Sequence, residues 1–142
     1  MNRGEIWLIN LDPTVGAEIR KIRPVVIVSS DAIGVLPLRV IVPVTDWKAR
    51  YEPAAWMVKI LPDQQNGLSK PSAADTFQIR SVATSRFIRE IGVISDADLK
   101  LIVNAIGLVK FADVTLKELG INIYKDPFTV KLTGGPNGEM AG

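Results

Sequence analysis

The 142-residue sequence contains no cysteine and no histidine. Without cysteine there is no disulfide, no thiol nucleophile and no thiolate ligand for a metal, which fits a reducing compartment. Without histidine there is no Ser-His-Asp triad, no His-ligated zinc and no imidazole for general acid–base catalysis. Any chemistry must therefore use Arg, Lys, Asp, Glu, Ser, Thr or Tyr.

Long apolar runs are also missing from the sequence. No stretch reaches the roughly 18 to 20 residues that a membrane-spanning helix needs, and the start MNRGEIW has no apolar core of a signal peptide. We therefore expect a cytoplasmic protein. The net charge of +2 is too small to indicate nucleic-acid binding by itself, so a site for a polyanion would need basic residues concentrated locally.

Most of the chain has the pattern of short β-strands. Segments rich in β-branched and aromatic residues alternate with turns that contain Pro, Gly, Asn or Asp. We expect strands at 3–11, 24–30, 38–44, 54–61, 72–82 and 86–94. Pro43 cannot donate to a ladder, so it should lie at a sheet edge or near a strand end. We interpret Trp7, Trp56 and Phe77 as core residues.

The hydrophobic period changes after these strands. Residues 95–113 place apolar side chains at the i, i+3, i+4 and i+7 spacing of an amphipathic helix, namely Leu99, Ile102, Val103, Ile106 and Val109. Ser95 and Asp98 resemble a capping box at its start. We expect this helix to pack on the sheet or to contribute to a dimer.

The connections between the strands are too short for parallel crossovers. We therefore expect an α+β, mainly β fold: a small antiparallel, barrel-like sheet with a C-terminal packing helix. Residues 1–113 should form the single domain. Residues 114–142, which end in the Gly-rich TGGPNGEMAG, are expected to be a C-terminal extension that is partly ordered at best.

Positive charge is concentrated in EIRKIRPVVIVSSD, residues 18–31, at the start of the strand predicted at 24–30. Arg20, Lys21 and Arg23 lie there with one carboxylate, Glu18. A guanidinium stays charged and can donate two parallel hydrogen bonds to phosphate oxygens. Because Pro24 begins a rigid strand, Arg23 would be aimed in advance. We interpret the cluster as a phosphate site, although solvated loop charges explain Arg20 and Lys21 equally well.

Several segments of the sequence together resemble the MazF/PemK-type toxins. In that family, G-[DE]-[IV]-[WY] leads through an acidic-Pro turn and a [ST]-x-G-x-E-like loop to R-P-V-V-[IV]-V-S. The counterparts here are Gly4-Glu5-Ile6-Trp7, Asp12-Pro13, Gly16 with Glu18, and Arg23-Pro24-Val25-Val26. Downstream, VIVPVTDW, GLSKPSAADTFQIRSV and SDADLKLIVNAIGLVKF resemble the strand ending in Thr or Ser, the G-L-x-K-x-S…Q-[IVL]-[KR]-[ST] segment and the closing helix. The resemblance covers about residues 3–112.

This resemblance implies an SH3-like barrel, a homodimer and a toxin of a toxin–antitoxin system. It further implies a metal-independent, sequence-specific endoribonuclease that needs no cofactor and cleaves single-stranded RNA such as mRNA. An acidic, flexible antitoxin would block the site. The family's catalytic positions carry over onto Arg23 and Thr45.

The chemistry of RNA cleavage suggests roles for these residues. Attack by the 2′-hydroxyl requires a base, a proton donor and stabilisation of the phosphorane, and Arg23 suits the last of these tasks. Thr45 could orient the 2′-hydroxyl or hydrogen-bond the phosphate. Glu18 could act as the base or hold an arginine in place, so the base stays unassigned.

Other residues are candidates for binding the RNA. Arg20 and Lys21 would contact phosphates. Trp47, Tyr51 and Phe77 are candidates for base stacking, with Trp47 the aromatic side chain best placed to be exposed, and Gln78 and Arg80 are candidates for reading base edges.

Two alternatives belong to other classes of function. Toxins of a related fold poison DNA gyrase without hydrolysis, typically through a Trp near the end of the helix, but this chain has no Trp after residue 56. Alternatively, the domain could be an inactive protein-interaction module, for instance one in which residues 114–142 cover the groove.

Overall fold

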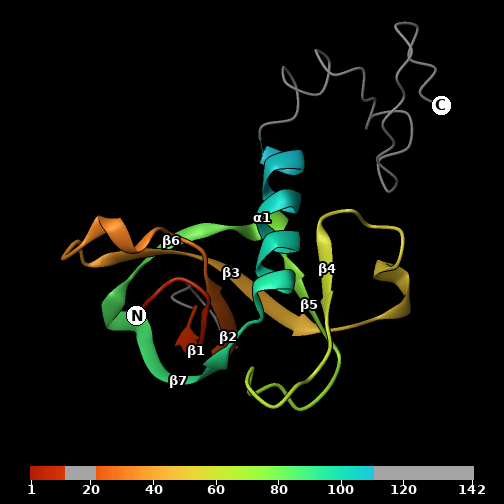
Figure 1. Ribbon diagram of the computed structural model, residues 1–142, viewed down its shortest axis with the longest axis horizontal. Coiled ribbons are helices and arrows are strands. Elements are labelled where there is room, and N and C mark those ends of the chain that lie inside the picture. Colours follow the sequence, from red (N-terminus) through yellow and green to blue (C-terminus); the bar gives the residue numbers. More distant parts are fainter. Residues whose placement is uncertain (12–21, 111–142) are drawn as a thin grey trace, which may run out of the picture.

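The computed structural model describes residues 1–11 and 22–110, and the side chain of Lys110 is not described. Seven strands and one α-helix follow one another along the chain (Figure 1). They are β1 (Glu5–Asn10), β2 (Ile22–Ile27), β3 (Leu38–Asp46), β4 (Met57–Ile60), β5 (Ser72–Asp75), β6 (Arg80–Ala83), β7 (Phe87–Val93) and α1 (Asp96–Lys110). The expected extension at 114–142 lies outside the described residues. No helix of the described ranges is long and apolar enough to cross a membrane.

All strand pairings in the described sheet are antiparallel, which confirms the expected fold class. The strand order is β4-β5-β3-β2-β1-β7, and β6 pairs with the first half of β3. Within the described residues, no ladder joins β6 to β7, so the barrel-like sheet is not closed.

The long strand β3 changes partner along one of its edges. Its first half pairs with β6 from Leu38 to Ile41, and its end pairs with β5 from Val44 to Asp46. Pro43 lies between these two ladders, three residues before the end of β3. Proline has no backbone N–H to donate to a neighbouring strand. At the point where β3 changes partner, this missing donor breaks no ladder hydrogen bond on that edge, which explains why Pro43 is tolerated there.

The prediction of one strand over residues 72–82 is wrong, because this segment forms two strands, β5 and β6, separated by a turn. Asp75 ends β5 because its side chain accepts a hydrogen bond from the backbone N–H of Phe77, at 3.1 Å, and a 3-10 turn follows at Thr76–Gln78. This turn redirects the chain from β5 to β6. It also leaves Phe77, which we expected in the core, 53% exposed. Phe77 lies instead against Trp56 at the surface, with ring centroids 5.7 Å apart.

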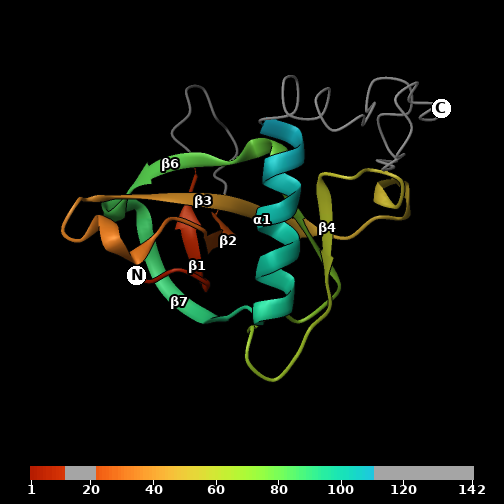
Figure 2. The same cartoon turned by 45° about the horizontal axis from the view of Figure 1, so that its top comes forward.

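Helix α1 confirms the predicted helix over its described length, and the last predicted residues, 111–113, lie outside the described part. The Ser95 hydroxyl accepts a hydrogen bond from the Asp98 N–H at 3.1 Å, as the capping motif predicted. Ile102 and Ala105 are the helix residues that are fully buried, whereas Val103, which we placed on the buried face, is exposed. Figures 1 and 2 show α1 lying across the sheet beside β4.

Buried apolar side chains form a core on each face of the sheet. The core under α1 contains Ile6, Val26, Val42, Val44, Val58, Ile60, Ala74, Ile102 and Ala105. The core on the other face contains Ile9, Val25, Ile27, Ile41 and Val82, with Trp7 and Phe87 packed against it. Trp7 and Trp56, both expected in the core, are half-buried. Residues that alternate along β2 and β3 therefore face different cores.

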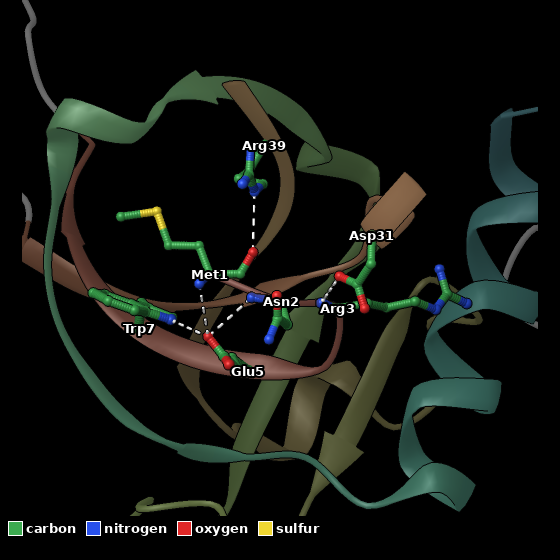
Figure 3. Close-up of polar contacts among 7 residues, drawn as sticks. All are labelled: Met1, Asn2, Arg3, Glu5, Trp7, Asp31 and Arg39. Carbon is green, nitrogen blue, oxygen red and sulfur yellow. Dashed lines mark hydrogen bonds and ion pairs between the residues drawn. The ribbon is translucent and has the colours of Figure 1, made fainter. Parts of the chain in front are cut away.

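The N-terminal residues are fixed by Glu5. Its Oε1 atom accepts hydrogen bonds from the Asn2 N–H at 3.0 Å and from Trp7 Nε1 at 2.9 Å, and it lies 3.4 Å from the Met1 ammonium (Figure 3). Arg39 on β3 donates to the Met1 carbonyl at 3.1 Å. These contacts tie the start of β1 to β3.

Candidate active site

Arg23 on β2 donates a hydrogen bond from Nη1 to the Thr45 hydroxyl on β3, at 3.2 Å. The strand register explains why they meet. Val25 is paired with Pro43 in the antiparallel ladder, and two residues further along each strand bring Arg23 opposite Thr45. Residues opposite one another in a ladder project from the same face. The two predicted catalytic residues are thus brought together, 22 positions apart in the sequence.

This pair lies on the face of the sheet that α1 does not cover. Val44, the residue before Thr45, is buried in the core under α1. Because side chains alternate along a strand, Thr45 points away from the helix, and Arg23 lies on the same face as Val25, which belongs to the core opposite α1. Both side chains are half-buried. A half-buried cation beside a hydroxyl, on the face of the sheet opposite α1, is suited to binding an anion such as a phosphate.

Trp47 extends the same face. The backbone N–H of Trp47 donates to the Pro71 carbonyl at 3.0 Å, so the β3–β5 ladder continues one residue beyond Asp46. Trp47 therefore projects from the same face as Thr45, about 7 Å further along the strand. Its ring is half-buried against Tyr51, with centroids 5.8 Å apart.

Lys59 is a residue of this face that sequence reasoning missed. It is opposite Ala73 on β5, and Ala73 is opposite Thr45 on β3. One row across the sheet therefore contains Lys59, Ala73, Thr45 and Arg23. The alternation in MVKI indicated that Lys59 faces away from Val58 and Ile60. Nothing in the sequence indicated that β4 lies two strands from β3.

Gln78 and Arg80 lie further from the pair. The Gln78 amide nitrogen donates to Asp75 Oδ2 at 2.7 Å in the 3-10 turn. Arg80 is opposite Ile41, four positions before Thr45 on β3, which corresponds to about 13 Å along the strand. Both are exposed. Glu18, Arg20 and Lys21 lie outside the described residues.

A metal site is not formed by the described side chains. Among residues 1–11 and 22–110, no cluster of three or more His, Cys, Asp or Glu residues could hold a metal ion. The functional groups of the described site are the Arg23 guanidinium, the Thr45 hydroxyl, the Lys59 ammonium and the aromatic rings of Trp47 and Tyr51.

Comparison with known proteins gives a consistent result. A family model for the PemK-like, MazF-like toxin of type II toxin–antitoxin systems matches residues 2–109. The chain is 38% identical over 114 residues to Endoribonuclease MazF9 of Mycobacterium tuberculosis, covering 76% of this chain and 94% of that protein.

Solved structures share the fold. The crystal structure of MazF from Deinococcus radiodurans matches with a TM-score of 0.62 at 24% identity, over 78% of this chain and 96% of that one. A MazE-MazF structure from the same organism matches with a TM-score of 0.64 at 23% identity, over 80% and 97% of the two chains.

Proposed function

Because the chain belongs to the PemK-like, MazF-like toxins of type II toxin–antitoxin systems, we propose that it is an endoribonuclease that cleaves single-stranded RNA. The observation that carries this proposal is the hydrogen bond between Arg23 and Thr45 on the face of the sheet opposite α1. The reaction is attack of the 2′-oxygen on the adjacent phosphorus, which releases the 5′-oxygen and leaves a 2′,3′-cyclic phosphate. We also propose that the reaction needs no metal ion and that cleavage is sequence-specific.

Arg23 is suited to stabilising the charge that develops on the phosphate. Its guanidinium has five N–H donors in a planar fork, of which only the Nη1 contact to Thr45 is needed to fix its direction. The remaining donors can bind the non-bridging oxygens, which become more negative as the phosphorane forms. Because β2 and β3 hold the side chain in place beforehand, little reorganisation is needed in the transition state.

Thr45 is suited to donating a hydrogen bond to the same phosphate group. Since its oxygen accepts a hydrogen bond from Arg23, its own proton is directed elsewhere. A phosphate oxygen bound by Arg23 lies within reach of that proton. We therefore assign Thr45 to the positioning of the phosphate, and we leave the base that deprotonates the 2′-hydroxyl unassigned.

The test is cleavage of a long single-stranded RNA by the purified protein in EDTA. We expect discrete cuts with 2′,3′-cyclic phosphate ends, and Arg23→Ala should lower the rate about 100-fold or more. The matched control is Arg89→Ala, which removes an exposed arginine on β7 and should cleave like wild type. Thr45→Val, which keeps the β-branched shape without the hydroxyl, should lose about 10- to 100-fold, while Thr45→Ser should retain most activity.

Two outcomes would contradict the proposal. A folded Arg23→Ala variant that cuts at the wild-type rate would overturn the assignment of the site. A folded wild-type protein that makes no cuts in any RNA would favour the alternatives of a non-catalytic toxin or an inactive interaction module. Stabilised DNA breaks in the presence of gyrase would then identify the first of these.

We propose that the partner of this toxin is an acidic, flexible antitoxin segment that occupies the same face in the cytoplasm, and that the toxin is a homodimer. The relative from Deinococcus radiodurans with a similar fold was solved as a MazE-MazF structure. An acidic segment would mimic RNA phosphates beside Arg23 and Lys59, so its affinity should fall as salt rises. Affinity that does not respond to salt would contradict this charge argument.

A further inference from the structure

We propose that Trp47 and Lys59, supported by Tyr51, form a binding site for the nucleotide that flanks the scissile phosphate in single-stranded RNA. The inference rests on the proposed function and extends it beyond the Arg23–Thr45 pair. The Trp47 ring would stack on the base, and the Lys59 ammonium would contact the phosphate of that nucleotide.

The position of these side chains follows from the ladders. Trp47 lies two residues after Thr45 on the same face, and Lys59 lies in the same row as Thr45 with the small Ala73 between them. Two strand spacings separate Lys59 from Thr45, which amounts to about 10 Å between their backbones. An RNA strand held at Arg23 and Thr45 can therefore reach Trp47 and Lys59 without leaving this face.

Two cations and two aromatic rings are linked by a chain of contacts that runs from Lys59 through Trp47 and Tyr51 to Arg50. Lys59 Nζ lies 5.0 Å from the centroid of the Trp47 ring, and the ring of Tyr51 meets that of Trp47 edge-on at an interplanar angle of 77°. The Arg50 guanidinium lies 5.4 Å from the centroid of the Tyr51 ring. Tyr51 thus supports the Trp47 ring from one side, while the other contact of that ring is an exposed, flexible lysine.

This arrangement fits a nucleotide in particular. Because the Lys59 side chain is exposed, its contact with the half-buried Trp47 ring is weak, so the ammonium can move aside for a base and turn to the adjacent phosphate. Aromatic stacking with a nearby cation is the common way to bind single-stranded nucleic acid. The neighbouring carboxylate of Asp46, which would repel a phosphate, is paired with Lys70 at 3.1 Å.

The experiment measures binding of an uncleavable RNA to the full-length chain. The RNA carries a 2′-deoxy nucleotide at the mapped cut, or is a mixed-sequence single strand if no cut is found. Trp47→Ala should weaken RNA binding about 5- to 100-fold. Trp47→Phe should retain most of the wild-type affinity because an aromatic ring remains. Lys59→Gln should reduce the slope of log Kd against log salt concentration by about 0.7. Lys59→Arg should keep the wild-type slope because the positive charge remains.

The controls separate the site from general effects on charge and folding. Lys100→Gln removes an exposed lysine from α1, which packs on the opposite face of the sheet, and should leave the salt slope unchanged. Circular dichroism and thermal unfolding of each variant establish that it is folded. If Trp47→Ala does not fold, Lys59→Gln still tests the proposal, because it leaves Trp47 in place and changes a surface side chain.

The possible results distinguish this inference from the proposed function. RNA cleavage together with unchanged binding by folded Trp47→Ala and Lys59→Gln variants would overturn the inference and leave the ribonuclease intact. Binding that depends on both residues without any cleavage would support the inference and overturn the ribonuclease. If both substitutions weaken binding of an acidic peptide but not of RNA, the site belongs to a protein partner and the nucleotide assignment is wrong.

Discussion

Glu5 shows how one carboxylate can fix the start of the chain. Burial would raise the pKa of its carboxyl group, but hydrogen bonds from Trp7 and Asn2 and the nearby Met1 ammonium together hold the pKa below its ordinary value. A carboxyl group whose pKa is lower in the folded state stabilises the fold above the pKa of the unfolded state. That contribution is lost as the pH falls through the folded-state pKa.

Glu5→Gln should therefore remove an acid-sensitive part of the stability. The loss in free energy of unfolding relative to wild type should be largest near neutral pH and should shrink as the pH falls below about 4.3. Urea unfolding at a series of pH values measures this difference. The matched control is Glu52→Gln, which removes the same charge at an exposed position. A Glu5→Gln difference that grows on acidification would contradict the argument.

Single residues also show what the sequence could predict at the site. Arg23 and Thr45 were predicted because the resemblance to the MazF/PemK-type toxins carries the catalytic positions of that family onto them, and the ladder brings the two side chains into contact. Lys59 was not predictable, because its position depends on a row across three strands. Phe77 was wrongly placed in the core because its hydrophobicity gave no sign of the turn capped by Asp75.

Among the elements, the helix was the easiest to predict and the segment 72–82 the hardest. A helix of fifteen residues repeats its apolar period several times and carries a local cap at Ser95. In 72–82, two short strands with β-compatible sequences pair with different halves of β3. Their separation depends on hydrogen bonds in a three-residue turn, which leave the hydrophobic pattern almost unchanged.

The loop between β4 and β5 is fixed against β7 through glycine. A Cβ atom on Gly92 would overlap the backbone of Gln65 and Asn66, and the Val93 N–H donates to the Gln65 carbonyl at 2.8 Å. The buried Asn66 holds the loop from inside, since its side chain donates to the Leu61 carbonyl at 2.9 Å and accepts from the Leu68 N–H at 3.0 Å.

Gly92→Ala should therefore separate the loop from β7 and lower the free energy of unfolding by about 2 kcal/mol or more. Gly107→Ala is the matched control, because a Cβ there meets nothing within 4 Å and the residue lies in α1. That control should stabilise the protein by about 0.5–1 kcal/mol through helix propensity. Chemical denaturation of both variants tests the comparison. Equal stability of the two variants would contradict the proposed steric role.

At the scale of the whole molecule, the two faces of the sheet carry different groups of residues. One face packs against α1, and the other carries Arg23, Thr45, Trp47 and Lys59 together with the second core of Ile9, Val25, Ile27, Ile41 and Val82. Patterns in the sequence predicted both the sheet and the helix. Which strands neighbour one another, and hence which residues share a face, depended on long-range pairing that a single sequence does not contain.

Packing under α1 should therefore affect stability without changing the site. Ile102→Val removes one methylene group from a fully buried position and should cost about 0.5–1.5 kcal/mol. Thermal unfolding should show a Tm lower by several degrees. On the proposed function, kcat/KM for RNA should stay within about twofold below the transition. A large loss of activity in the folded variant would show that the two faces are coupled.

The change of partner strand along β3 also has a consequence for how related proteins can diverge by recombination. The β4–β5 ribbon is joined to β3 through the pairs Val44–Ala74, Thr45–Ala73 and Asp46–Ser72 and through the hydrogen bond from the Trp47 N–H to the Pro71 carbonyl. Residues 47–71, which include Trp47 and all of β4 with Lys59, connect the end of β3 to the start of β5 at this short ladder. On the proposed function, recombination with crossovers after Asp46 and before Ser72 would exchange RNA preference as a cassette. The bond-breaking pair would stay in place, so chemistry and target choice could diverge independently among relatives.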